Sequence, residues 1–339
     1  MSVADADRGR PRILAFDLIR AVAILLVLLD HLLPEYRSGQ EPSNFELIGK
    51  YWFTGPDAVL FFLLSGALLL PVSGSWRGFY TKRIGRVAIP WVFWGLFYAF
   101  FICWIYHWPS SFSLFLARWF WVSPSFPPGW FLNAIIGIYI VMPVISPWLV
   151  KASRRQIELM LAFWLGAGLL PWLNYLMGAT DFEKTLFGCF FNYLGYALAG
   201  YYLVRYPLTF KGKRSLITYA LILLGAVIPW AAIFIPSNMP VVDFLYNNMT
   251  FNVMSLSILF FSLLLTVKSA PKPLAWLIRL ISRNAFGIYL IHYALRLVLF
   301  KRIDPEICYT WWGFPIVTLA SLLLSETLRR IPYLRRLVI

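Results

Sequence analysis

The sequence predicts an all-α polytopic membrane protein with about ten transmembrane helices and both termini in the cytoplasm. Of the 339 residues, 60% are hydrophobic and only 13% are charged, whereas soluble proteins carry about 25% charged residues. The apolar segments are long enough to cross a bilayer as helices. The basic residues alternate between successive loops, as the positive-inside rule requires of a polytopic chain.

The first apolar segment, residues 13–33, follows arginines at positions 8, 10 and 12. This order is typical of a signal peptide as well as of a first transmembrane helix. The apolar run is about 20 residues long, and no small-x-small cleavage site follows it, so we expect a retained helix.

Nine further apolar segments complete the predicted bundle. No polar stretch is long enough for a separate soluble domain, so we expect residues 1–339 to form a single transmembrane domain. A Pro-rich aromatic stretch, 108–128, is predicted to lie at the membrane interface or to re-enter the membrane. In chain order the remaining predicted helices are 54–71, 86–106, 130–150, 157–177, 186–204, 215–235, 247–267, 284–300 and 311–328.

The distribution of basic residues fixes the predicted orientation. The N-terminus, the loops after each even-numbered helix and the C-terminus hold 22 of the 30 lysines and arginines, and only Arg20 and Arg296 lie inside predicted helices. The asymmetry reverses with every crossing, which places both termini in the cytoplasm. It also accounts for most of the net charge of +15 without a nucleic-acid partner.

Cysteine and histidine spacing excludes two other classes of site. No CxxC occurs, and the cysteines are far apart, so we expect them to pack as small apolar residues. The three histidines are not at metal-ligand spacing and no HExxH occurs, so we predict no metal site. The cysteines are Cys103, Cys189 and Cys308.

The first helix holds four ionisable residues: Asp17, Arg20, Asp30 and His31. Charges inside a bilayer are costly and usually functional. Arg20 and His31 are eleven positions apart, so they project from one helix face roughly 16 Å apart along the axis. Asp17 shares that face and can pair with Arg20, whereas Asp30 points away from it.

Four further segments accompany this helix in a recognisable order. FFLLSG lies at 61–66, Arg-x-x-Arg at 83–86, a WFL…Y…P helix at 129–144, and a segment from Ser282 that ends in IYLIH at His292. Together with Arg-x10-His, these motifs resemble the transmembrane acyltransferase 3 family. The resemblance spans residues 13–300 and is to the stand-alone type without a soluble C-terminal domain. The family often has a histidine just before WFL, where this chain has Pro127, Pro128 and Gly129.

The resemblance implies a membrane O-acyltransferase of the bacterial inner membrane. Such a protein would move an acyl group, most often acetyl, from cytoplasmic acyl-CoA (acetyl-CoA) to a hydroxyl of an extracytoplasmic glycan or glycolipid. Its expected partners are acyl-CoA, the acceptor and membrane lipid, with no nucleic acid. The expected reaction is direct attack of the hydroxyl on the thioester, with an acyl-histidine relay as a variant.

The chemistry of acyl transfer assigns roles to the polar residues. A near-neutral imidazole is the usual general base, so His31 is the predicted base. Arg20 is its charged companion, and Asp17 or Asp30 would orient or tune the imidazole. Arginines suit phosphate binding, and we predict a CoA site of Lys82, Arg83, Arg86, Ser65, His292 and Arg296. His292 is expected near mid-membrane, closer in depth to Arg20 than to His31. The predicted acceptor-binding residues are Trp130, Asn133, Tyr139 and Tyr289.

Two other functions remain open at this stage. In a transporter of a glycan intermediate or small solute, the intramembrane arginine and histidine would line the path. The sequence has no inverted repeat and no matched broken helices, which argues against that function. A structural subunit of a polysaccharide-synthesis complex is the third possibility, and it would need neither Arg20 nor His31.

Overall fold

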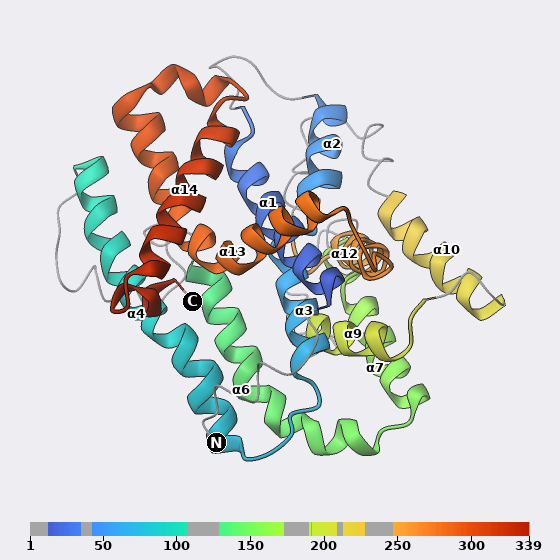
Figure 1. Ribbon diagram of the computed structural model, residues 1–339. Helices are drawn as coiled ribbons and strands as arrows, with labels where there is room; N and C mark the ends of the chain where they lie inside the picture. Colours follow the sequence, from blue (N-terminus) through green and yellow to red (C-terminus); the bar gives the residue numbers. More distant parts are fainter. Residues whose placement is uncertain are drawn as a thin grey trace.

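A computed structural model shows an all-α fold, as predicted from the sequence (Figure 1). It describes residues 13–34, 43–107, 129–172, 190, 192–208, 213–227 and 247–338. The predicted interfacial stretch 108–128 lies outside these residues. So do the segments 173–177, 186–189 and 228–235 of three predicted helices, and Cys189.

Helices account for most of the described chain. In order they are α1 (Leu14–Leu32), α2 (Asn44–Thr54), α3 (Val59–Leu69), α4 (Trp76–Tyr106), α6 (Gly129–Lys151), α7 (Arg154–Ala167), α9 (Leu194–Arg205), α10 (Lys213–Val227), α12 (Phe251–Leu265), α13 (Lys272–Val298) and α14 (Gly313–Arg330). A π-helical turn, η4 (Leu299–Ile303), and a 3₁₀ turn, η5 (Pro305–Tyr309), join the last two, and η6 (Leu334–Leu337) follows α14.

Four helical stretches of the described chain are long and apolar enough to cross a membrane. They are Gly49–Leu69, Trp76–Tyr106, Gly129–Lys151 and Lys272–Ile303. The count of ten crossings and the cytoplasmic placement of both termini stay predictions.

Several helix boundaries differ from the predicted ones. The predicted helix 54–71 corresponds to α3, which a turn at residues 55–58 separates from α2. α7 ends at Ala167, ahead of the predicted 177, and α9 begins at Leu194 rather than 186. α4 begins at Trp76 rather than 86, and α13 begins at Lys272 rather than 284. Hydropathy finds the apolar core of a helix, and the basic turns that precede this core in α4 and α13 do not register as apolar. Local chemistry starts both helices: the Ser75 side chain accepts from the Gly78 N–H at 3.1 Å, and Pro273 lies in the first turn of α13.

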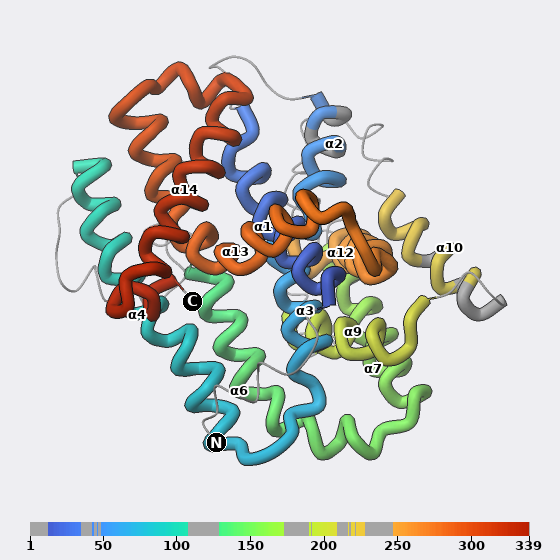
Figure 2. Tube along the Cα trace, viewed as in Figure 1, coloured from blue at the N-terminus to red at the C-terminus, as the bar shows by residue number. Residues whose placement is uncertain are grey.

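The centre of the bundle is made by α1, α3, α9 and α13, with α14 against α13, α6 against α4 and α12 against α10 (Figures 1 and 2). Its largest fully buried apolar side chains include Ile24 and Leu28 of α1 and Phe62 and Leu63 of α3. In contrast, α4 exposes Phe93, Phe97, Phe100 and Trp104. An exposed apolar stripe of this kind is the surface that a bilayer covers.

α3 and α9 approach each other through glycines. A Cβ atom on Gly66 would overlap the backbone of Ala197, and one on Gly200 would overlap the backbone of Leu63. Small residues at facing positions allow helix backbones this close together, as is common inside membranes. FFLLSG therefore has a packing role at Gly66.

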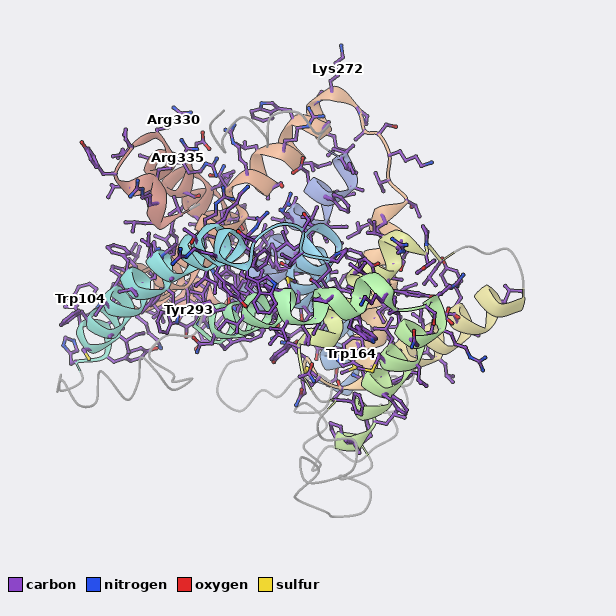
Figure 3. All side chains as sticks on the ribbon, turned by 90° about the horizontal axis from the view of Figure 1, so that it is seen from below. Trp104, Trp164, Lys272, Tyr293, Arg330 and Arg335 are labelled. Carbon is purple, nitrogen blue, oxygen red and sulfur yellow. The ribbon has the colours of Figure 1, made fainter. Side chains whose placement is uncertain are left out.

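Three basic residues and two tryptophans lie at different levels of the bundle. In Figure 3, Lys272, Arg330 and Arg335 lie toward the upper edge, and Trp104 and Trp164 lie well below them. At the Trp104 end, Arg302 donates to the carbonyl oxygens of Trp104 and Ile105, both at 3.3 Å. These carbonyls belong to the last turn of α4, where a cation is favoured by the helix dipole.

Candidate active site

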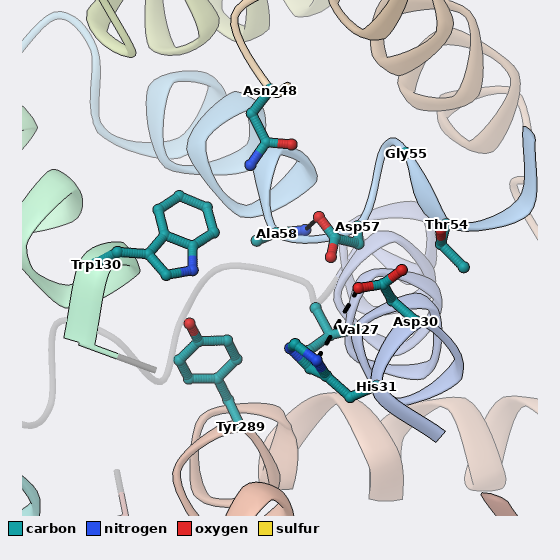
Figure 4. A pocket seen from close by; sticks show the side chains of 10 residues that line it. All are labelled: Val27, Asp30, His31, Thr54, Gly55, Asp57, Ala58, Trp130, Asn248 and Tyr289. Carbon is teal, nitrogen blue, oxygen red and sulfur yellow. Dashed lines mark hydrogen bonds and ion pairs between the residues drawn. The ribbon is translucent and has the colours of Figure 1, made fainter. Parts of the chain in front are cut away.

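A cavity of about 190 Å³ opens between α1, the α2–α3 turn, α6, α13 and the segment that leads into α12. An apolar cavity of about 150 Å³ is enough to hold benzene, so this one has room for the reacting end of a small polar substrate. Figure 4 shows polar groups from five segments around this space. The lining residues are Val27, Asp30, His31, Thr54, Gly55, Asp57, Ala58, Trp130, Asn248 and Tyr289.

His31 contributes the imidazole of the cavity. It lies in the last turn of α1, and its side chain is 38% exposed. Its Nδ1 is 4.0 Å from Oδ2 of Asp30, and Oδ1 of Asp30 is 3.6 Å from Nζ of Lys50. The Asp30 carboxylate thus lies between an imidazole and an ammonium group, although Asp30 and His31 point in different directions along the helix.

The α2–α3 turn brings a second carboxylate, Asp57, into the cavity. Its Oδ1 accepts a hydrogen bond from the N–H of Ala58, which is one of the N–H groups left unpaired at the start of α3. Asp57 was not among the predicted site residues, and it lies inside the predicted helix 54–71. Gly55-Pro56 ahead of the aspartate is the signal that could have revealed the break.

Aromatic side chains form the opposite wall. Trp130 of α6 packs against Tyr193 and Phe62, with ring centroids 5.8 and 6.4 Å apart, and Tyr289 of α13 packs 5.0 Å from Phe131. In Figure 4 the indole nitrogen of Trp130 and the hydroxyl of Tyr289 point into the space across which His31 and Asp57 lie. Both residues were predicted acceptor contacts, and both are at the cavity.

Asn248 closes the cavity on the side of α12. The hydroxyl of Tyr196 donates to its backbone oxygen at 2.5 Å, and its side chain is close enough to act on the hydroxyl of Tyr193. Asn248 lies in the first turn of the predicted helix 247–267, and no motif of the sequence marks it as a site residue.

His292 lies beside His31, which corrects the depth predicted for it. The two imidazole rings are stacked with centroids 5.4 Å apart and planes inclined by 27°. Lower on the same two helices, the hydroxyl of Ser282 donates to Oδ1 of Asp17 at 2.7 Å. The two contacts occur in the same order along both helices, so α1 and α13 run parallel. With Ser282 level with Asp17, His292 lies roughly 15 Å further along α13. This is closer to the level of His31, roughly 21 Å along α1, than to that of Arg20, roughly 5 Å along it.

The α13 backbone around His292 is held by side chains. The hydroxyl of Tyr98 donates to the carbonyl of Leu290 at 2.7 Å and accepts from the N–H of Ala294 at 3.1 Å. These two backbone groups are four residues apart and would bond to each other in a regular helix. A side chain inserted there opens the turn locally, and His292 lies within it.

A second polar cluster surrounds Tyr139 of α6. Ser65 of α3 lies close enough to Tyr139 to act on its hydroxyl, and so do the charges of Arg20, Arg83 and Arg86. Arg20 in turn donates to Oδ1 of Asp17 at 3.3 Å. We call Arg20, Ser65, Arg83, Arg86 and Tyr139 the arginine cluster. It brings together residues from α1, α3, α4 and α6 that the sequence analysis assigned to three different roles.

The other predicted site residues are dispersed. Lys82 is half-buried on α4 beside Arg83. The Oδ1 of Asn133 accepts from the indole N–H of Trp91 at 2.9 Å, so Asn133 joins α6 to α4 and does not line the cavity. The Arg296 guanidinium lies 5.7 Å from the ring centroid of Tyr293 and is close enough for its charge to act on His31 and His292.

The arginine cluster and the cavity occupy two levels of one bundle. Arg20 and His31 mark these levels on α1, roughly 16 Å apart along the helix. The described residues contain no group of three or more His, Cys, Asp or Glu side chains that could hold a metal ion.

A family domain described as an acyltransferase domain (Acyl_transf_3) matches residues 13–330. The chain belongs to the acyltransferase 3 family. Neither a curated protein nor a solved structure matches it. The chain is therefore a membrane acyltransferase, and the resemblance on Arg20, His31 and the four later motifs is confirmed. In this acyltransferase the match covers α1 to α14, and so both the cavity and the arginine cluster.

Proposed function

We propose that this acyltransferase moves an acyl group, acetyl in the simplest case, from cytoplasmic acyl-CoA to a hydroxyl of an extracytoplasmic glycan or glycolipid. The observation that carries the proposal is the position of His31, which lines a cavity together with carboxylate, amide and aromatic side chains. The membrane is the bacterial inner membrane, and both termini of the chain are cytoplasmic.

The donor binds at the level of the arginine cluster. A CoA molecule carries several phosphate charges, and guanidinium groups bind phosphate oxygens in pairs of hydrogen bonds. Arg83 and Arg86 belong to the basic start of α4, where the positive-inside rule places the cytoplasm. From there the pantetheine arm extends along α1 past Arg20 and Tyr139, so that its thioester reaches His31.

The acceptor binds in the cavity. Aromatic rings stack on sugar faces, and carboxylate and amide groups hydrogen-bond to hydroxyls; Trp130, Tyr289, Asp57 and Asn248 provide this set. His31 removes the proton of the reacting hydroxyl while its oxygen attacks the thioester carbon. The C–S bond then breaks, and the imidazole returns the proton to the departing thiolate.

The test is turnover of acetyl-CoA by the purified protein, with and without a glycan acceptor. His31→Ala is expected to lower turnover by a factor of about 100 or more, the range for loss of a general base. His107→Ala is the matched control, because His107 is an exposed imidazole at the end of α4 and does not line the cavity. Wild-type turnover in His31→Ala would contradict the assignment.

A further inference from the structure

His292 holds an unused hydrogen-bond acceptor next to the proposed base. The residue is 1% exposed. Its Nδ1 lies 2.7 Å from the carbonyl oxygen of Tyr289 and 3.2 Å from that of Ile288. A carbonyl oxygen can only accept, so Nδ1 carries the ring proton. The other nitrogen, Nε2, then presents a lone pair.

Within the described part of the chain, that lone pair has no hydrogen-bond partner. Among the residues that the structure describes, Nε2 of His292 is buried and makes no hydrogen bond. A buried polar atom without a partner is costly, and such atoms in folded proteins usually await a water, an ion or a ligand. The backbone contacts at Nδ1 and the Tyr98 hydroxyl across Leu290 and Ala294 hold the ring in place. The unpaired atom is therefore fixed in position.

Its surroundings define the kind of ligand that fits. The ring is stacked on His31 but does not line the cavity, so a group that reaches Nε2 approaches His31 from outside that cavity. The charge of Arg296 acts on both imidazoles, which disfavours a cationic ligand group at this place. A neutral hydrogen-bond donor satisfies both conditions.

We propose that Nε2 of His292 accepts a hydrogen bond from the thioester end of the acyl donor. This inference rests on the proposed function, since it assumes that acyl-CoA is the donor. Two groups at that end of CoA are neutral donors: the nearest amide N–H of the pantetheine arm, and the S–H of the released thiol. His292 is then a donor-binding residue beside the base.

The experiment is calorimetric binding of CoA and of acetyl-CoA to the purified full-length protein. His292→Asn is the informative variant, because the asparagine amide nitrogen replaces Nδ1 and keeps the bond to the backbone carbonyl, while nothing replaces Nε2. His292→Gln is the matched control, because its amide oxygen can occupy the Nε2 position. Thermal unfolding of each variant checks that the fold is retained.

His292→Asn is expected to weaken binding by about tenfold, as loss of one buried hydrogen bond does, and His292→Gln by less than about threefold. If both ligands bind more weakly, the amide N–H is the group that donates to Nε2. If only CoA binds more weakly, the donor is the S–H, which acetyl-CoA lacks. Unchanged affinity for both ligands in a folded His292→Asn protein, with or without loss of turnover, overturns the inference. If the wild-type protein binds neither ligand, the proposed function itself fails.

Discussion

The hydroxyl of Ser282 on α13 donates a 2.7 Å hydrogen bond to the buried carboxylate of Asp17 on α1. This bond lies at one end of the parallel α1–α13 pair, and the stacked His31 and His292 rings lie at the other. Asp17 also pairs with Arg20. The bond thus fixes the vertical register of the two helices that carry the imidazoles, and it holds the carboxylate that orients Arg20.

Ser282→Ala is expected to lower the free energy of unfolding by about 1.5–3 kcal/mol, since hydrogen bonds to charged groups are in this range and the Asp17 oxygen would lose a partner. Ser262→Ala is the matched control, because Ser262 is a buried serine of α12 whose hydroxyl makes no hydrogen bond within the described chain. Replacing Ser262 should leave the free energy of unfolding nearly unchanged. Thermal unfolding in detergent measures both, and equal melting temperatures for the two variants would contradict the proposed strength of the bond.

Gly66→Ala should separate α3 from α9. The added methyl group would overlap the carbonyl group of Ala197, which is backbone and cannot turn aside. We expect a loss of about 3 kcal/mol, the upper part of the range for overpacked cores. Gly137→Ala is the control: Gly137 is an exposed helical glycine with nothing within 4 Å of its Cβ position. It should be neutral or gain up to about 1 kcal/mol from helix propensity, and a melting temperature as low as that of Gly66→Ala would count against the packing argument.

The periodicity of one helix was enough to predict much of the candidate site. Arg20 and His31 could be selected because a 3.6-residue repeat places them on one face and because charges inside a bilayer are rare. Both now lie in polar clusters at different levels, and Trp130 and Tyr289 line the cavity as the motif order suggested. The choice of Arg20 and His31 needed only local geometry and composition, whereas that of Trp130 and Tyr289 also needed the resemblance to the family motifs.

What the sequence did not predict depends on the register between helices. The depth of His292 is set by the bond between Ser282 and Asp17, which lie 265 positions apart in the chain. Tyr139 was expected with Trp130, but it lies nine residues further along α6, roughly 14 Å away, among the arginines. Asp57 was missed because hydropathy does not register a single broken turn within an apolar segment.

Neutralising the arginine cluster should weaken donor binding strongly and slow the chemical step only slightly. Arg83→Gln and Arg86→Gln are each expected to raise the KM for acetyl-CoA by about tenfold, with kcat changed by less than about threefold, because phosphate contacts far from the thioester bind substrate and transition state equally. Arg77→Gln is the control, as an exposed arginine of the same helix that does not act on Tyr139. Steady-state kinetics with purified protein decides the question. A fall in kcat with unchanged KM would place these arginines at the reacting atoms instead.

Asp57→Asn should lower kcat/KM for the acceptor and leave the affinity for the donor nearly unchanged. The substitution keeps the size of the side chain and an acceptor oxygen for the Ala58 N–H, but it replaces the other carboxyl oxygen with an amide NH2 group, which cannot accept. A hydroxyl that donates to this oxygen would lose about 1–3 kcal/mol, which is a drop of roughly 5- to 150-fold in kcat/KM for the acceptor. Binding of CoA should change by less than about twofold. Glu306→Gln, an exposed carboxylate that does not line the cavity, is the control. If Asp57→Asn weakened CoA binding and left acceptor kinetics intact, the cavity would be the donor site and the roles of the two clusters would be reversed.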